Sequence, residues 1–208
     1  MAQAPSPLLS FDLFHRSMRR GATWLASALA VDDAGPPPPA LRDWFDHYRK
    51  ACLLHAEGED TVLWPALLER RPDLSSMVAT MEQEHSELER VLAALASALV
   101  DPGEGGDARA LAAGLVRVME SHLDDEERTA VAALVENLSD DLGDLVRQVQ
   151  QNAGPQGAAI AVPFLLEHAT ADERASVVSA LPPPVREGLA QWEPEYQRLL
   201  VERAATAA

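Results

Sequence analysis

Four histidines recur along the first two thirds of the chain, each in a segment rich in alanine and leucine. They are His15, His55, His85 and His122. Glu59 lies four residues after His55, and Glu126 lies four residues after His122. Imidazole nitrogen together with carboxylate oxygen suits iron, manganese or zinc. The residue types therefore predict a site for such cations.

The four histidines lie on the apolar stripes of their segments. Residues three or four apart share one helix face, and the third segment shows such a row in Met81, His85 and Leu88. The other three segments have a similar row around their own histidine. An unpaired carboxylate on a buried face is costly, because burial favours the neutral acid. Four histidines and two glutamates in one core are explained best by two metal ions with the carboxylates between them.

Proline and glycine divide the chain into the segments that must position these ligands. The long apolar segments cover residues 8–31, 40–70, 73–100 and 108–137. Few β-branched runs and short connections predict an all-α protein, an up-down-up-down four-helix bundle. Pro65 should kink the second helix or end it one turn early.

The last part of the chain differs from the bundle segments. Residues 138–208 are expected to form a C-terminal helical tail of short helices packed on a bundle of residues 1–137. A further helix or a continuation of the fourth is expected from Ser139 to Gln151. The tail beyond Gly154 could shape a pocket or support a dimer, so both a monomer and a homodimer stay open.

Composition excludes several classes of protein. The 208 residues carry 33 acids against 17 bases, for a net charge of −16. This balance argues against a nucleic-acid partner, which calls for a basic surface, and against an anionic membrane. The single cysteine, Cys52, rules out an intrachain disulfide and fits a cytoplasmic location. No apolar run approaches the ~18 residues of a membrane span, and the N-terminal charges follow the apolar residues, unlike a secretory signal.

The order of the motifs is similar to that of a known family. The stretches "LFHRSMRR", "HAEGEDTVLWPALLE", "MEQEHSELE" and "SHLDDEERTAVAALVE" together resemble the hemerythrin-like, or HHE cation-binding, domain over about residues 8–137. The resemblance implies a four-helix bundle with two non-haem iron ions and an oxo or hydroxo group between them. It also implies that the four histidines are terminal ligands and that Glu59 and Glu126 bridge the ions.

The third helix departs from the pattern of the oxygen carriers. Those proteins have a fifth histidine there, in an H-x-x-x-H pair, whereas here Met81 stands one turn before His85 and Glu89 one turn after it. Either Glu89 replaces the missing ligand or the position stays open to water or substrate, and Glu82 is a weaker candidate.

The remaining acids and histidines receive simpler interpretations. Oxygen carriers have an aspartate five residues after the last histidine. Here that position is Glu127, and Glu126 is preferred as ligand because it lies closer to the apolar stripe. The acids expected to face solvent or to point away from the site are Glu57, Asp60, Glu84, Glu87, Asp124, Asp125 and Glu127. His47 is expected at the surface, His168 at a helix end or in packing, and Cys52 in the core.

Three functions follow from a metal pair in such a bundle. A binding protein would take up O2, NO or peroxide in storage, sensing or detoxification. An enzyme would use the metals for oxidase, peroxidase-like, catalase-like or ferroxidase-like chemistry on a small substrate. A scaffold would use them only to hold the helices. The lost fifth histidine leans away from a pure O2 carrier.

Overall fold

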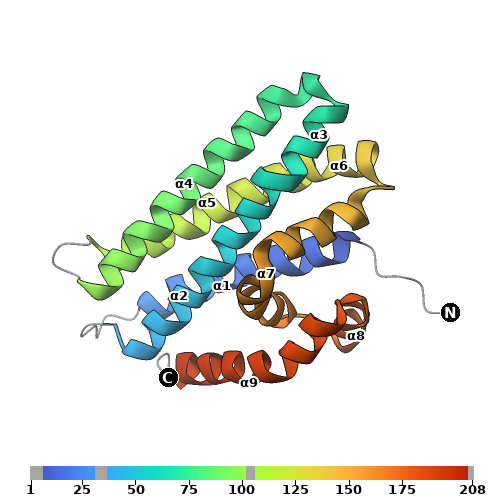
Figure 1. The fold of residues 1–208 in the computed structure, drawn as a ribbon. Coiled ribbons are helices and arrows are strands. Elements are labelled where there is room, and N and C mark those ends of the chain that lie inside the picture. The colour runs from blue at the N-terminus through green and yellow to red at the C-terminus, as the bar shows by residue number, and fades with distance from the viewer. Residues whose placement is uncertain (1–6, 31–36, 102–105, 206–208) are drawn as a thin grey trace.

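The computed structural model describes residues 7–30, 37–101 and 106–205, and within these ranges the chain is helical and has no β-strand (Figure 1). The all-α class is therefore confirmed. The elements are α1 (Pro7–Leu29), α2 (Pro39–Gly58), the π-helical turn η1 (Glu59–Leu63), α3 (Trp64–Arg70), the 3-10 turn η2 (Pro72–Leu74), α4 (Ser75–Val100), α5 (Ala108–Arg128), α6 (Ala130–Leu138), α7 (Leu142–Leu166), α8 (Ala171–Ala180) and α9 (Pro183–Ala205). None of the described helices is long and apolar enough to cross a membrane.

Four long helices form a bundle, and its buried apolar side chains fall into two core clusters, of which the larger contains residues of all four helices. Helix α5 packs against α1 and α4, and α2 packs against α4 and α1. Leu13, Leu92 and Leu115, from three different helices, are fully buried in the larger cluster. A helical bundle is therefore confirmed, while the up-down-up-down order of its helices stays a prediction.

The second helix changes its winding at Glu59, the first of the two predicted ligand glutamates. The N–H of Trp64 bonds the carbonyl of Glu59, five residues back, in a π-helical turn that spans Glu59–Leu63. Pro65 then lies in the first turn of α3, where a missing N–H is tolerated. The wider turn thus absorbs the disturbance expected from this proline. Such π-turns within helices are frequent at functional sites.

The fourth segment is not one continuous helix. Thr129 adopts φ −114° and ψ −64° and separates α5 from α6. Its hydroxyl donates to the carbonyl of Asp125 at 2.6 Å, a local bond that competes with helix continuation. The break was not expected from the sequence, which showed no proline or glycine there. Both carboxylate-bearing helices therefore change course within one turn of their glutamate.

The extension after the bundle contains two long helices, α7 and α9, and the shorter α8. Helix α7 is bent at Gly154, whose φ of 64° and ψ of −171° lie outside the helical region, just beyond the end of the helix expected from Ser139 to Gln151. Helix α9 spans 23 residues, so the expectation of short helices alone is wrong. Helix α7 packs on α1 and α2, α8 on α1, and α9 on α2 and α7, on the side away from α4 (Figure 1). The boundary at residue 138 stays a prediction.

Candidate metal centre

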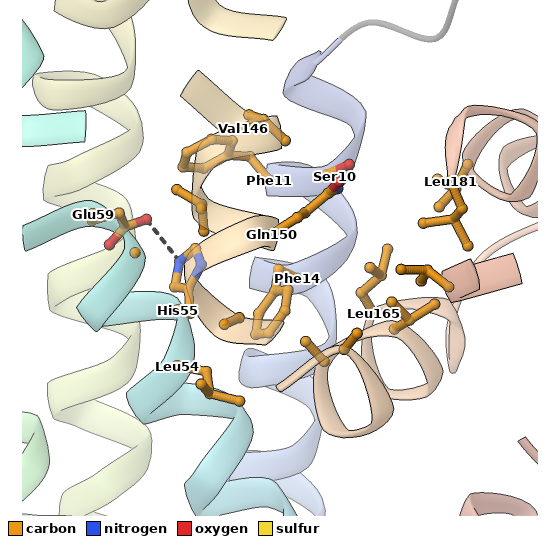
Figure 2. Close-up of a pocket in the computed structure, with 18 of the residues that line it drawn as sticks. Ser10, Phe11, Phe14, Leu54, His55, Glu59, Val146, Gln150, Leu165 and Leu181 are labelled. Carbon is orange, nitrogen blue, oxygen red and sulfur yellow. Dashed lines mark ion pairs between the residues drawn. The ribbon is translucent and has the colours of Figure 1, made fainter. Parts of the chain in front are cut away.

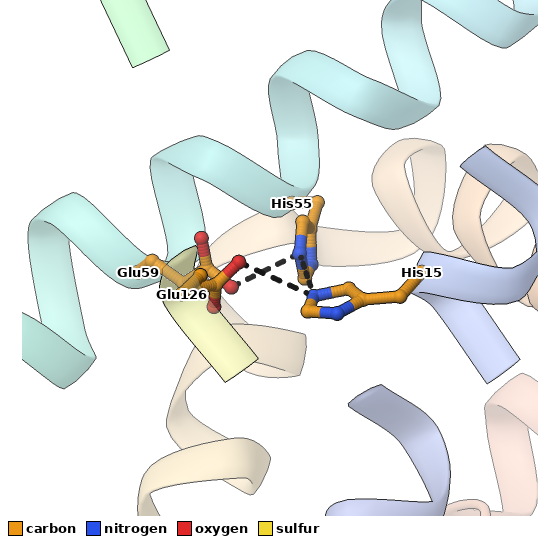
Figure 3. Close-up of side chains that lie close together, drawn as sticks. All are labelled: His15, His55, Glu59 and Glu126. Carbon is orange, nitrogen blue, oxygen red and sulfur yellow. Dashed lines mark hydrogen bonds and ion pairs between the residues drawn. The ribbon is translucent and has the colours of Figure 1, made fainter. Parts of the chain in front are cut away.

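Side chains from four elements converge in the middle of the bundle. His15 of α1, His55 of α2, Glu59 of η1 and Glu126 of α5 offer ligand atoms that lie within 4.8 Å of one another. Figure 3 shows the two imidazoles turned toward the two carboxylates. The glutamates and three of the four predicted histidines are buried, and His55 is nearly so. The apolar stripes thus place these side chains inside, as the sequence pattern predicts.

Each carboxylate lies between histidines of two different helices. One oxygen of Glu59 lies 3.0 Å from Nε2 of His55, and the other lies 3.3 Å from Nε2 of His85. Oε2 of Glu126 lies 3.4 Å from Nε2 of His15 and 3.7 Å from Nε2 of His122. The glutamates therefore join two histidine pairs, one formed by His15 and His55 and the other by His85 and His122.

Several buried polar atoms on the inside of this cluster lack hydrogen-bond partners. Among the described residues, no partner is found for either oxygen of Glu59 or of Glu126, nor for Nε2 of His85 and of His122. Buried polar atoms are normally satisfied, and each unsatisfied one costs about 1–3 kcal/mol. Six such atoms around one point are explained by cations that accept their lone pairs.

The spacing within one histidine pair also fits a cation. Nε2 of His15 and Nε2 of His55 lie 3.0 Å apart. Two nitrogens bound to one octahedral ion at about 2.1 Å, with an angle of about 90° between them, would be separated by about 3.0 Å, which is also the distance of a hydrogen bond between the two rings. Nitrogen and oxygen donors without thiolate suit iron, manganese or zinc. The group formed by His15, His55, Glu59 and Glu126 therefore fits such a cation.

Three of the histidines are held from behind by a second set of carboxylates. The pairs are His15 Nδ1 with Glu127 at 2.8 Å, His85 Nδ1 with Asp60 at 2.8 Å and His122 Nδ1 with Glu84 at 3.0 Å. An N–H donated outward from Nδ1 leaves Nε2 as the free nitrogen on the inside. Such outer carboxylates orient metal-bound imidazoles and raise their basicity.

The sequence interpretation missed this outer set. Asp60, Glu84 and Glu127 were expected to face solvent or to point away from the site. Glu127 is indeed exposed, but all three also contact a histidine of the cluster, which was not expected. Each is directly adjacent in sequence to a predicted ligand. That adjacency was the available signal, because a residue next to an inward-facing one on a helix lies at the edge of the same face.

Arg19 extends the outer set on one side. Its guanidinium donates to Glu127 at 2.7 Å and to Asp124 at 2.8 Å. The hydrogen bond from His15 and the guanidinium of Arg19 lower the pKa of Glu127 to about 2. Glu127 is therefore charged at neutral pH and accepts the Nδ1 proton of His15.

The inner carboxylates cannot both be comfortably ionised without a cation. Burial and the nearby charge of Glu59 raise the pKa of Glu126 well above its usual range. Burial alone would also raise the pKa of Glu59, but His55 and His85 together hold it below its usual value. Besides the proton that the raised pKa keeps on His85, the metal-free cluster therefore holds one on Glu126. Added cations would release it, because they stabilise both carboxylates in the charged form.

In the metal-free protein, the pKa values of His85 on α4 and His122 on α5 shift in opposite directions. Burial lowers the pKa of His85, but Asp60 and Glu59 more than offset that effect and raise it to about 9. Burial and repulsion from His85 lower the pKa of His122 to about 4. His122 is therefore neutral at pH 7 and ready to bind a cation.

The other sequence candidates lie outside the cluster. Glu89 and Glu82 are exposed on α4, so the structure does not bring Glu89 to the position of the missing histidine. His47 is half-buried, since its ring contacts Tyr196 and its Nε2 donates to the carbonyl of Ile160 at 3.1 Å. Its expected surface position is therefore wrong. Cys52 is fully buried, and burial raises its pKa to about 12, as expected for a core thiol.

The comparisons with known proteins point to one family. No curated protein and no solved structure shows significant similarity to the chain. The family model described as the hemerythrin HHE cation binding domain matches residues 7–134, which is more than half of the chain. The matched region contains all six residues of the buried cluster. The chain therefore belongs to the hemerythrin HHE cation-binding domain family.

Proposed function

We propose that this chain holds two iron ions in the buried cluster and uses them to bind O2 or a related small molecule, NO or peroxide, in storage, sensing or detoxification. The observation that carries the proposal is the placement of two buried carboxylates, each between histidines of two helices and without hydrogen-bond partners. Manganese or zinc would fit the same donor set. A bound iron pair supplies reversible binding and one-electron chemistry that no side chain offers.

The protein's own contribution is to orient the ligands and to control access. His15 and His55 would serve one ion, and His85 and His122 the other, with Glu59 and Glu126 shared between them. The outer carboxylates hold the Nδ1 protons of three histidines, so that Nε2 stays directed inward. The apolar bundle around the cluster excludes water and lowers the local dielectric, which strengthens the interaction of ligands with cations.

A second candidate function is a di-iron enzyme acting on a small substrate. It is favoured by the six-ligand set, which offers one histidine fewer than oxygen-carrying relatives. It is also favoured by an apolar cavity that reaches His55 and Glu59. We expect a reducing, cytoplasmic setting for either function, and either a monomer or a homodimer.

Reconstitution tests the binding function and separates it from the enzyme. The metal-free protein is loaded with ferrous iron without oxygen, bound iron is counted, and absorption is followed after O2 and then H2O2. Two irons per chain and a stable, reversible absorption band are expected. Rapid bleaching with O2 release from peroxide would instead establish the enzyme. Less than one iron per chain, together with no stabilisation by manganese or zinc, would contradict the metal centre itself.

A matched pair of variants assigns the iron to the cluster. Glu59→Gln keeps the shape of the buried side chain but removes the charge, so most bound iron should be lost. Glu89→Gln makes the same chemical change on the exposed face of α4 and should leave the iron content unchanged. Equal iron content in both variants would place the metal elsewhere.

A further inference from the structure

An apolar cavity of about 130 Å³ lies between the bundle and the C-terminal extension (Figure 2). Its walls are mostly aliphatic and aromatic, with Phe14 of α1 and Leu54 of α2 on the bundle side and Leu165 of α7 on the other. Val177 of α8 and Val185 of α9 also contribute. The volume is close to the ~150 Å³ of an engineered apolar cavity that takes up benzene or xenon, although this cavity is partly open to solvent.

The extension builds most of this cavity. The lining residues from Val146 onward belong to α7, α8, α9 and the turn between the last two, and they outnumber those from α1, α2 and η1. The region that matches the family ends at residue 134. The cavity is therefore a feature of this chain's own C-terminal helices and not of the matched bundle alone.

The inner end of the cavity reaches the metal cluster through His55. The Phe14 ring stacks on the imidazole with centroids 4.8 Å apart and an interplanar angle of 9°, and Phe11 meets it edge-on at 5.9 Å. The side chain of His55 is 9% exposed, more than that of His15, at 2%, or of His122, at 1%. A molecule in the cavity would thus lie directly beside a ligand of the cluster.

The chemistry of the walls selects the occupant. Among the described lining residues, none is a lysine or arginine, and the only acid is Glu59 at the inner end. A charged molecule would lose its hydration without gaining a partner, which is costly. Two neutral polar side chains, Ser10 and Gln150, line one wall, and Figure 2 shows the Gln150 side chain pointing toward Ser10. A diatomic gas would leave most of the volume empty.

We propose that this cavity binds an uncharged, apolar organic molecule about the size of benzene and holds it beside His55. Binding depends only on the shape and apolar walls of the cavity. Its chemical use rests on the proposed iron centre, since the bound molecule would be the substrate of the enzyme described above as the second candidate, or would control access to the ions.

Fluorobenzene is a suitable probe, followed by ¹⁹F NMR with the full chain, both metal-free and iron-loaded. Saturable binding is expected in both forms. Ala161→Phe places a ring in the cavity and should weaken binding by roughly tenfold or more, because the ring fills the space of the probe. Ala190→Phe adds the same ring at an exposed site of α9 and should bind as the unaltered protein does. If Ala161→Phe does not fold, Val185→Phe at the cavity wall replaces it.

The outcomes separate this proposal from the proposed function. Absence of saturable fluorobenzene binding, or equal binding by both phenylalanine variants, would overturn the cavity proposal, even with two irons bound. Xenon binding without fluorobenzene binding would indicate a gas route and would also overturn it. Normal fluorobenzene binding by a chain that takes up no metal would leave the cavity established and the iron centre refuted.

Discussion

Glu126→Gln should stabilise the metal-free protein while abolishing its response to metal. In the metal-free protein, burial and Glu59 raise the pKa of Glu126 well above the ordinary value of 4.5. When the pKa of a carboxyl is higher in the folded than in the unfolded state, the folded protein loses stability as the pH rises above the pKa of the unfolded state. Glutamine has the same shape and no charge to desolvate, so this loss disappears at pH 7.

The size of the effect follows from the cost of unsatisfied buried groups. Both oxygens of Glu126 lack a hydrogen-bond partner among the described residues, and leaving such a group buried costs about 1–3 kcal/mol. The amide NH2 of glutamine can donate to Glu59, so a gain of about 1–2 kcal/mol is expected. In a domain of this size, each 1 kcal/mol corresponds to roughly 2–4 °C in Tm. The metal-free variant should therefore melt about 2–8 °C above the unaltered protein at pH 7.

Added metal should reverse the order of the two melting temperatures. A cation present at about 1,000 times its Kd adds roughly 4 kcal/mol to the stability of the unaltered protein. The variant lacks one shared ligand and should gain little. Melting curves with and without ferrous iron, at pH 7 and at pH 4, measure both effects. At pH 4 the metal-free difference should shrink, because the carboxyl is then mostly protonated in both folded and unfolded chains.

Two results would refute this reasoning. One is a metal-free Glu126→Gln protein that melts below the unaltered protein at pH 7, because the buried carboxylate would then be stabilising without a cation. The other is equal stabilisation of both proteins by iron. Glu89→Gln, an exposed carboxylate on α4, should change neither quantity and serves as the control.

Three further predictions concern the outer carboxylates, the bend of the extension and the effect of acid. Asp60→Asn should weaken metal binding about 10–100-fold in a chelator competition, while Glu57→Gln at an exposed site should not. Equal metal affinities of the two variants would contradict a role of the outer carboxylates in metal binding. Gly154→Ala should lower the free energy of unfolding by about 1–3 kcal/mol, because φ of 64° with ψ of −171° is a conformation that almost only glycine adopts. Gly143→Ala in the regular part of α7 should be neutral or stabilising, and equal losses in the two denaturant titrations would contradict the role of the bend. Lowering the pH from 7 to 5 should release metal during dialysis, since protons compete for the histidine nitrogens, and full retention at pH 5 would argue against histidine ligation.

The inner ligands were predictable because their positions follow from helix periodicity. His15 and Glu126 lie on apolar rows, and a polar residue on a buried face needs a partner, which the other helices supply. The spacing of His55 and Glu59 places both on one face of α2 and η1. The apolar pattern of each helix thus fixes which of its side chains point inward. The need of these side chains for a common cation then indicates that the helices pack together.

The outer carboxylates were not predictable in the same way. Asp60 and Glu84 lie at the edge of the buried face, and their direction depends on the neighbouring helix. Their hydrogen bonds to histidines of other elements appear only when α2, α4 and α5 are packed. The break at Thr129 was missed because no proline or glycine marks it.

The cavity depends on packing between segments far apart in sequence. Phe14 and Val185 line the same space although most of the chain lies between them. Apolar residues in the extension predicted that it would pack on the bundle, but not that a gap would remain against His55. Such gaps depend on side-chain volumes in the assembled fold, which periodicity alone does not give.

Anomalous X-ray scattering at the iron edge, from crystals of the iron-loaded protein, tests the central claim most directly. Two peaks are expected inside the bundle. One should lie beside Nε2 of His15 and His55, and the other beside Nε2 of His85 and His122. The carboxylates of Glu59 and Glu126 should stand between the two peaks. A single peak at the surface, or no peak while both carboxylates keep their positions, would contradict the account.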